Sequence, residues 1–278
     1  MYGQVTVGWG MSIYIIDKMA SLCKFLTQFK RGKGYMIDRA DEVYHVFQPV
    51  FSVKHEKAIG FEALLRHNDA IRPDDLFKMA RERGCLYFLD ALSINKAIET
   101  FHGQTDGYLF LNVFPSTLLA SGFPQFLEET VSQYPIRTDE VVFEINETFI
   151  EEDVWNNPSF EKHIHLLRQQ GFKVAFDDVG VGVASLKKIV EFQPDIIKLD
   201  RYFSTNLSRS EMKREIVNLS AAFCQSQNVM LILEGIENSD DFIAAKQMNV
   251  PYVQGYFTGE PLPSQHLEKV PTQNVDNC

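Results

Sequence analysis

The sequence predicts an α/β fold, namely a modified TIM-type (β/α)₈ barrel whose first strand runs antiparallel. Three observations lead to this fold class. Eight short apolar runs, rich in β-branched and aromatic residues, follow one another along the chain. Amphipathic stretches separate most of these runs, and such alternation is typical of a parallel sheet. The length of 278 residues suits a barrel of this kind, which takes roughly 250 residues as one domain.

The eight predicted strands are the apolar runs themselves. In chain order they are Val46–Val53, Ala58–Leu65, Tyr108–Phe114, Val141–Ile145, Lys173–Phe176, Ile196–Leu199, Met230–Leu233 and Tyr252–Phe257. Several are apolar almost throughout, as expected where both faces of a sheet are covered, and eight of them favour a closed barrel. The first two lie too close together for a helical crossover. We therefore expect them to pair as an antiparallel hairpin.

Helices are predicted between the strands, where start signals and terminal glycines frame amphipathic stretches. The clearest stretches are Pro73–Gly84, Phe160–Gly171, Arg209–Gln227 and Asp240–Met248.

The chain is predicted to have three parts: an extension over residues 1–40, a barrel domain over residues 41–270 and a tail over residues 271–278. Within the extension, charged residues interrupt the apolar stretch Met11–Leu26, which is too short for a membrane span. We interpret it as an accessory amphipathic helix that packs on the barrel. A surface anchor or an arm that binds a protein partner is the alternative.

The charge and the cysteines exclude some classes of partner and compartment. The formal net charge is −10, and the only basic run is Lys30-Arg31-Gly32-Lys33, so a DNA or RNA polymer is not an expected partner. Four scattered cysteines form no disulfide pattern, and we expect a reducing cytoplasm. A small anion stays compatible with this charge if carboxylates hold a metal that reverses the local field.

Polar residues end the predicted strands or follow them directly. They are Glu62, Asn112, Glu144, Asp177, Asp178, Lys198, Glu234 and Gln254. Because the carboxyl ends of barrel strands meet at one mouth, we expect these side chains to converge there. Taken singly, a carboxylate at a strand end is more often a helix cap or a salt-bridge partner, and Lys198 could be a solvated strand end.

Five clustered carboxylates favour a divalent metal site. Without a cation they would repel one another or take up protons. Oxygen ligands without histidine or thiolate indicate Mg²⁺ or Mn²⁺ rather than zinc, and the adjacent Asp177 and Asp178 could serve two ions. Lys198 would stabilise charge that develops on a phosphate. The residues thus predict a metal site that works on a phosphate ester.

The strings around these residues resemble the motifs of bacterial EAL domains, which are phosphodiesterases that hydrolyse cyclic di-GMP to linear pGpG. The first is Gly60-Phe-Glu-Ala-Leu-Leu-Arg66. The others follow in the family's order: Leu111-Asn-Val113, Phe143-Glu-Ile-Asn-Glu147, Phe176-Asp-Asp178, Ile197-Lys-Leu-Asp200, Leu233-Glu-Gly-Ile-Glu237, and Gln254-Gly-Tyr256 before Pro261-Leu-Pro263. The resemblance covers about Val46 to Pro263.

This resemblance implies a role for each matching residue. One metal would be bound by Glu62, Asn112, Glu144 and Asp177, and the second would lie near Asp177, Asp178 and Glu234. Lys198 and Glu234, together with Glu62, would be the catalytic residues, with the first two assisting the hydrolytic water. Gln48, Arg66, Glu237 and Gln254 would contact the dinucleotide or line its pocket, and Glu147 would support the loop after the paired aspartates. The resemblance also implies a homodimer. It further implies a barrel whose first strand is antiparallel, in agreement with the hairpin predicted above.

The loop after Asp178 departs from the family pattern, which reads DDFGTGYSSL, whereas this chain has Asp177-Asp-Val-Gly-Val-Gly-Val-Ala-Ser-Leu186. The two aromatic residues of the pattern are missing, which removes packing anchors, and Val181 lacks the hydroxyl that the pattern has at this position. Two functions therefore stay open. The favoured one is an active phosphodiesterase, since every expected ligand type is present. The other is a catalytically silent domain that binds cyclic di-GMP or a protein partner.

Overall fold

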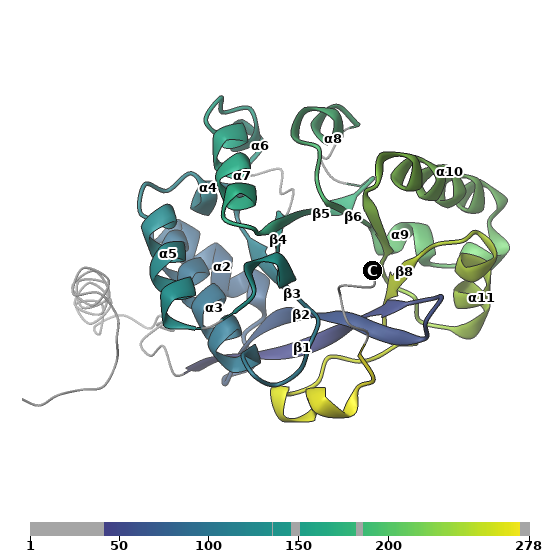
Figure 1. The fold of residues 1–278 in the computed structure, drawn as a ribbon, viewed down its shortest axis with the longest axis horizontal. Coiled ribbons are helices and arrows are strands. Elements are labelled where there is room, and N and C mark those ends of the chain that lie inside the picture. The colour runs from purple at the N-terminus through teal and green to yellow at the C-terminus, as the bar shows by residue number, and fades with distance from the viewer. Residues whose placement is uncertain (1–41, 135, 146–150, 182–185, 273–278) are drawn as a thin grey trace, which may run out of the picture.

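The computed structural model describes residues 42–134, 136–145, 151–181 and 186–272, so the predictions for residues 1–40 and for Glu147 fall outside it. Its strands close into one barrel in chain order, with helices around the outside (Figure 1). The strands are β1 Val43–Ser52, β2 Lys57–His67, β3 Tyr108–Val113, β4 Val141–Ile145, β5 Lys173–Val179, β6 Ile196–Leu199, β7 Met230–Leu233 and β8 Tyr252–Gln254. The predicted (β/α)₈ barrel is confirmed.

The first strand is the irregular element of the barrel. β1 pairs antiparallel with both β2 and β8, whereas every other neighbouring pair of strands is parallel. The turn between β1 and β2 is short, and Glu56 in it has a left-handed φ of 54°. So short a turn leaves no room for a crossover helix. The predicted antiparallel hairpin is therefore confirmed.

Helices follow most of the other strands. They are α2 Pro73–Glu82, α3 Leu86–Phe101, α4 Pro115–Leu118, α5 Phe123–Gln133, α6 Glu152–Trp155, α7 Phe160–Gln169, α8 Leu186–Phe192, α9 Arg201–Ser204, α10 Glu211–Gln227 and α11 Ser239–Gln247, with 3₁₀ turns η2 Thr138–Glu140, η4 Leu207–Arg209 and η5 Ser264–Lys269. None of the helices in the described part of the chain is both long and apolar enough to cross a membrane.

The end of β8 differs from the prediction. The strand stops at Gln254 instead of continuing to Phe257. At Gly255 the backbone runs against the loop after β7, where an added Cβ would lie 2.2 Å from the carbonyl oxygen of Ile236. The Ile236 amide donates a hydrogen bond to the Gln254 carbonyl, and the Phe257 amide donates one to the Ile236 carbonyl. These contacts turn the chain out of the barrel although the residues that follow are apolar.

Two apolar layers hold the barrel in shape. Inside it, alternate strand residues such as Val50, Phe110, Val142 and Ile232 fill the centre. Between the barrel and the helices lies a larger core in which aromatic rings such as Phe143 are fully buried. The alternation of inward and outward side chains fixes which residue faces the barrel axis at each level. The top inward level, at the carboxyl ends of the strands, is polar.

Candidate functional site

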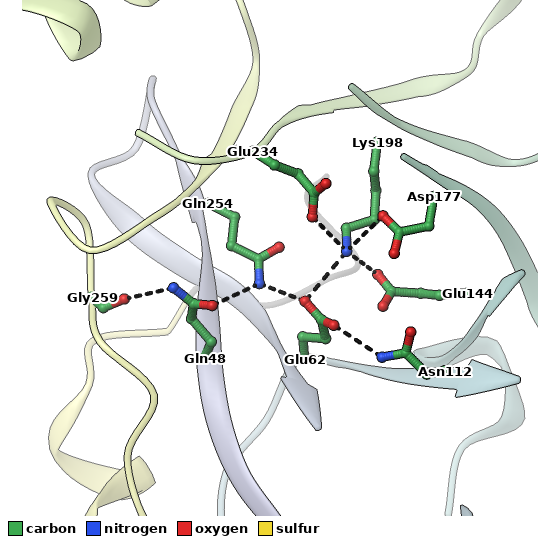
Figure 2. Close-up of polar contacts among 9 residues, drawn as sticks. All are labelled: Gln48, Glu62, Asn112, Glu144, Asp177, Lys198, Glu234, Gln254 and Gly259. Carbon is green, nitrogen blue, oxygen red and sulfur yellow. Dashed lines mark hydrogen bonds and ion pairs between the residues drawn. The ribbon is translucent and has the colours of Figure 1, made fainter. Parts of the chain in front are cut away.

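The predicted strand-end residues meet at the carboxyl end of the barrel. Glu62 lies on β2, Asn112 on β3, Glu144 on β4, Asp177 on β5, Lys198 on β6 and Gln254 on β8, and Glu234 follows β7 (Figure 2). Strand register places some of them side by side. Asn112 is the direct partner of Glu144 across β3 and β4, and Glu62 is the partner of Gln48 across the hairpin. The predicted convergence is thus present.

Lys198 lies at the centre of the site and is completely buried. Its Nζ is 2.8 Å from Glu144 Oε1, 2.9 Å from Glu234 Oε1, and 3.3 Å from both Glu62 Oε2 and Asp177 Oδ1. One ammonium thus joins carboxylates from four different strands or strand ends (Figure 2). The reading of Lys198 as a solvated strand end is wrong, because its side chain points into the barrel among these acids.

A chain of amides orients Glu62. Asn112 Nδ2 donates to Glu62 Oε1 at 3.0 Å, and Gln254 Nε2 donates to Glu62 Oε2 at 2.7 Å. The same Gln254 amide lies 3.4 Å from Gln48 Oε1, and Gln48 Nε2 donates to the Gly259 carbonyl at 3.2 Å (Figure 2). The glutamate is therefore fixed on both oxygens. Gln48 and Gln254 lie beside Glu62, and their contact with a substrate stays a prediction.

The carboxylates do not share one ionisation state. Burial raises the pKa of Glu62, but the Lys198 ammonium and the Gln254 and Asn112 amides outweigh it, so the pKa of Glu62 lies below its usual value. For Glu144 and Glu234, burial and the neighbouring carboxylates hold the pKa well above the usual value. Burial opposes the charge on Lys198 as well, yet its four acidic partners raise its pKa. The site thus favours the ionised form of Glu62 and disfavours that of Glu144 and Glu234, which added positive charge would offset.

The paired aspartates adopt an unusual backbone conformation. Asp178 has a left-handed φ of 53°, and the pairing of β5 with β6 is irregular between Phe176 and Val179. Aspartate tolerates this conformation better than most residues. Burial, followed by the charges of Asp177 and Asp200, raises the pKa of Asp178 to about 7. Carboxylate oxygens of Asp177, Asp178 and Glu234 lie within 4.8 Å of one another, which is close enough to share a metal ion.

The charges and free oxygens of the site fit divalent cations. Five carboxylates and one ammonium carry a formal charge of −4 when all are ionised, which two divalent ions would balance. The buried Oε2 of Glu144 has no hydrogen-bond partner among the described residues. Buried carboxylate oxygens without a donor are costly unless a cation binds them. The residues present therefore fit the predicted metal ligands.

Two predicted substrate residues lie outside this cluster. Arg66, further along β2, donates from Nη1 to the Leu65 carbonyl at 2.8 Å. Glu237 is half-exposed and forms an ion pair of 2.8 Å with Arg201. Neither contacts Lys198 or its four acidic partners in the contacts that the described residues make. Both stay predictions as contacts to a substrate larger than the cluster itself.

Some residues that shape the site did not emerge from the sequence. Asp200 accepts from the Tyr202 amide at 2.7 Å and caps α9, while its charge acts on Asp178. Its place two residues after Lys198, at the end of the string Ile197-Lys-Leu-Asp200, was a usable signal. Asp90 on α3 accepts a hydrogen bond from the Phe114 amide at 2.9 Å, and Glu151 accepts hydrogen bonds from the amide and the hydroxyl of Ser116. They fix the turn that follows Asn112, through contacts that only the fold reveals.

The described part of the altered loop is held by packing. Gly180 has a left-handed φ of 103° and lies against Phe203, whose ring an added Cβ would meet at 2.5 Å. Val181, where the family pattern has a hydroxyl, is about half-exposed at 47%. Residues 182–185 lie outside the described ranges. The stretch up to Val181 is therefore anchored from α9, without the aromatic residue of the family pattern.

A (β/α)₈ barrel with a lysine-centred acidic cluster at its carboxyl end defines a class of α/β barrel proteins whose carboxylates suit divalent cations. Residues 35–261 match the sequence profile of the EAL domain, so the chain belongs to the EAL domain family.

Similar proteins carry names that refer to cyclic di-GMP. The chain is 27% identical over 239 residues to "Probable cyclic di-GMP phosphodiesterase PdeI" of Escherichia coli, covering 82% of this chain and 30% of that protein. It is 28% identical over 231 residues to "Cyclic di-GMP phosphodiesterase RocR" of Pseudomonas aeruginosa, covering 80% of this chain and 58% of that protein. The chain therefore spans less than two thirds of the length of these curated relatives.

Solved structures share the fold. A complex of Klebsiella pneumoniae BlrP1 with manganese and cyclic di-GMP at pH 9.0 superposes with a TM-score of 0.72 at 25% identity, over 80% of this chain and 57% of that one. A standalone EAL protein from Vibrio cholerae, solved with cyclic di-GMP, gives a TM-score of 0.72 at 24% identity, over 80% of this chain and 93% of that one.

Proposed function

We propose that this chain is a metal-dependent phosphodiesterase that hydrolyses cyclic di-GMP to linear pGpG. The observation that carries the proposal is the buried ammonium of Lys198 among four carboxylates, with an excess of negative charge that divalent ions would balance. The names of the curated relatives support the choice of substrate. Hydrolysis would lower the level of this second messenger.

Two ions, Mg²⁺ or Mn²⁺, are proposed as cofactors. Glu62, Asn112, Glu144 and Asp177 would hold one, and Asp177, Asp178 and Glu234 the other. When bound, such ions act as Lewis acids that polarise the phosphate and favour ionisation of water. The manganese in the solved BlrP1 complex supports a divalent ion in this family of sites.

The residues of the chain would divide the chemistry among them. Glu234, whose pKa is raised by burial, suits a general base that accepts a proton from the attacking water. The water oxygen forms a bond to phosphorus, the bond from phosphorus to the ribose 3′ oxygen breaks, and that oxygen takes up a proton. Lys198 stabilises the negative charge that develops on the phosphate oxygens. Glu62, fixed by Asn112 and Gln254, keeps its place throughout.

Substrate binding is proposed for residues around the cluster. Gln48 and Gln254 stand next to Glu62 and can donate amide hydrogens to the dinucleotide. Arg66 and Glu237 would contact its more distant parts, and Glu147 would support the loop after the aspartates, all three by analogy with the family motifs.

We also propose that the protein works in the cytoplasm and binds no DNA or RNA polymer. Its N-terminal extension would pack on the barrel or bind a protein partner.

A homodimer is proposed as well. It is supported by exposed apolar rows on two helices that follow adjacent strands. α8 exposes Leu186 and Val190, and α10 exposes Met212, Leu219 and Phe223. A second copy would cover these rows. The acidic net charge supports the absence of a polymer partner.

A turnover assay tests the proposed function. Purified protein with cyclic di-GMP and Mg²⁺ or Mn²⁺ is expected to release pGpG, and Glu62→Ala is expected to release none while it keeps its circular dichroism spectrum. Nucleotide binding without product would instead support the catalytically silent receptor, which the aliphatic residues Val179 and Val181 of the altered loop favour. Unchanged turnover in Glu62→Ala would contradict the metal role of that residue.

A further inference from the structure

The hairpin of β1 and β2 continues beyond the closed barrel. β2 pairs with β3 only from Gly60 to Ala63, and β1 pairs with β8 only from Val50 to Ser52. Phe47 forms one isolated bridge with Leu262, outside the strands. Among the described residues, the strand ends Val43–Val46 and Leu64–His67 pair only with each other. The hairpin therefore ends as a two-stranded ribbon at the mouth of the barrel, on the side of Glu62.

The back of this ribbon is anchored to helices. Val43 and Leu65 are buried with apolar residues of α2 and α3. His45 Nε2 lies 3.0 Å from Ser93 Oγ, and Lys96 Nζ donates to the Val43 carbonyl at 2.9 Å. A ribbon held this way along its back offers a fixed front face.

The front face continues the row of side chains that starts in the acidic cluster. Residues directly opposite in an antiparallel pair point to the same side, and every second residue along a strand does so too. The cross-strand pairs on this side are Gln48 with Glu62, Val46 with Leu64, and Tyr44 with Arg66. Because Glu62 points into the cluster, the Tyr44 ring and the Arg66 side chain lie on the same face, two pairs further out.

The chemistry of this outer pair suits a nucleobase. Tyr44 is 47% exposed, and the Arg66 guanidinium is fixed by its bond to the Leu65 carbonyl. Aromatic rings and guanidinium planes are the groups on which bases stack. Tyr44 lies four residues from Gln48, roughly 13 Å along the strand, a span that a ribose and its base can bridge from a phosphate at the cluster. A single exposed tyrosine is ordinary on a protein surface, but this one continues the row of the site.

We propose that Tyr44 is a substrate-binding residue on whose ring one guanine of the cyclic dinucleotide stacks, beside the guanidinium of Arg66. The inference rests on the proposed function, since it assumes that the scissile phosphate lies at the acidic cluster. It adds a residue that none of the family motifs includes.

The test compares two substitutions at this position. Tyr44→Val removes the ring and keeps a residue that favours strands, whereas Tyr44→Phe keeps the ring. For Tyr44→Val we expect a KM for cyclic di-GMP about tenfold higher with kcat changed by less than about twofold, as for loss of one stacked base. Tyr44→Phe is expected to match the wild type. Tyr202→Val, at a tyrosine on α9 with 59% exposure, is the control and should leave KM unchanged.

Equilibrium binding of cyclic di-GMP separates this inference from the proposed function. If the wild type binds the nucleotide without turnover, weaker binding by Tyr44→Val alone still supports stacking. Equal KM and affinity in the wild type and Tyr44→Val would overturn the stacking role and leave the phosphodiesterase standing. A fall in kcat with unchanged KM would also overturn it. A wild type that neither binds nor hydrolyses cyclic di-GMP would overturn both, and the melting temperature of each variant reports whether it folds.

Discussion

Lys198 acts on the acidic cluster in two ways. Its ammonium is the one positive group within 4.0 Å of the four carboxylates among the described residues, and it therefore offsets part of their repulsion without any metal. Removing one partner from a buried ionic network leaves the other charges uncompensated. In the proposed mechanism the same ammonium also stabilises charge that develops on the phosphate. The side chain would thus contribute both to folding and to the proposed chemistry.

Lys198→Met separates these contributions. In EDTA the variant is expected to melt about 6 °C below the wild type. Removing the ammonium should lower the free energy of unfolding by roughly 3 kcal/mol, and each kcal/mol shifts the melting temperature of a chain of this size by about 2 °C. Added Mn²⁺ should raise its melting temperature by more than that of the wild type, because the ions then replace the lost charge. Hydrolysis should stay at least about 100-fold lower with metal present.

Lys187→Met is the matched control, since Lys187 pairs with Glu191 only at the surface and such pairs contribute little. Scanning calorimetry with and without Mn²⁺ gives the melting temperatures. Equal metal-induced shifts in the wild type and Lys198→Met would contradict the role of Lys198 as counter-ion.

His45 gives the fold a pH dependence of its own. Burial, then the charges of Lys96 and Arg66, lowers the pKa of His45 from 6.5 to about 3. The unfolded chain therefore binds a proton between pH 6.5 and pH 3 that the folded chain does not, so stability is lost as the pH falls through this window. At pH 5 the loss from this residue is about 2 kcal/mol relative to neutral pH.

His45→Gln should remove this part of the acid sensitivity. The free energy of unfolding of the variant, measured with urea at pH 7.5 and pH 5, is expected to fall by about 2 kcal/mol less than that of the wild type. His266→Gln, at an exposed histidine, is the control for loss of an imidazole. An equal loss of stability in His45→Gln and the wild type would show that His45 titrates normally in the folded protein.

At the scale of elements, strands were predictable where the apolar pattern and the end of the strand coincide. β4, β6 and β7 have the predicted bounds because a polar residue or a turn stops each apolar run. β8 is shorter because the close approach of Gly255 to Ile236 turns the chain, and apolar residues continue past it. α3 was not among the helices named, since residues are buried around much of its circumference and weaken the helical period. Local pattern thus predicts an element, whereas tertiary contact decides its end.

The same distinction applies to the site. The convergence of Glu62, Glu144, Asp177 and Lys198 could be predicted, because the (β/α)₈ topology brings strand ends together whatever the loops do. The hydrogen bonds of Asp90 and Glu151 to the turn after Asn112 could not, because α3 and the segment before α6 meet that turn only in the folded chain. The position of Tyr44 likewise depends on the register of the hairpin, because a slip of one residue would move its ring to the opposite face.

At the scale of the whole molecule, exposed apolar side chains are concentrated on helices beside β5 and β6. Along α10, Met212, Ile216, Leu219 and Phe223 recur at intervals of four, three and four residues, the spacing of a helix that packs on another helix. Leu219 is 67% exposed and Leu186, at the start of α8, is 79% exposed. Rows of this kind are unusual on the surface of a monomer, where large apolar residues are normally scattered.

The proposed homodimer predicts that a charge in this row separates the copies. Leu219→Glu places a carboxylate at the middle of the α10 row, where burial in an interface would be costly but exposure on a monomer is not. Light scattering at micromolar concentration is expected to give a dimer mass for the wild type and a monomer mass for Leu219→Glu. Ile243→Glu, at a residue of α11 with 51% exposure, should leave the dimer intact. α8 and α10 follow β5 and β6, the strands that carry Asp177 and Lys198, so loss of the dimer should also lower turnover. A wild type that is monomeric over the whole concentration range would contradict this assembly.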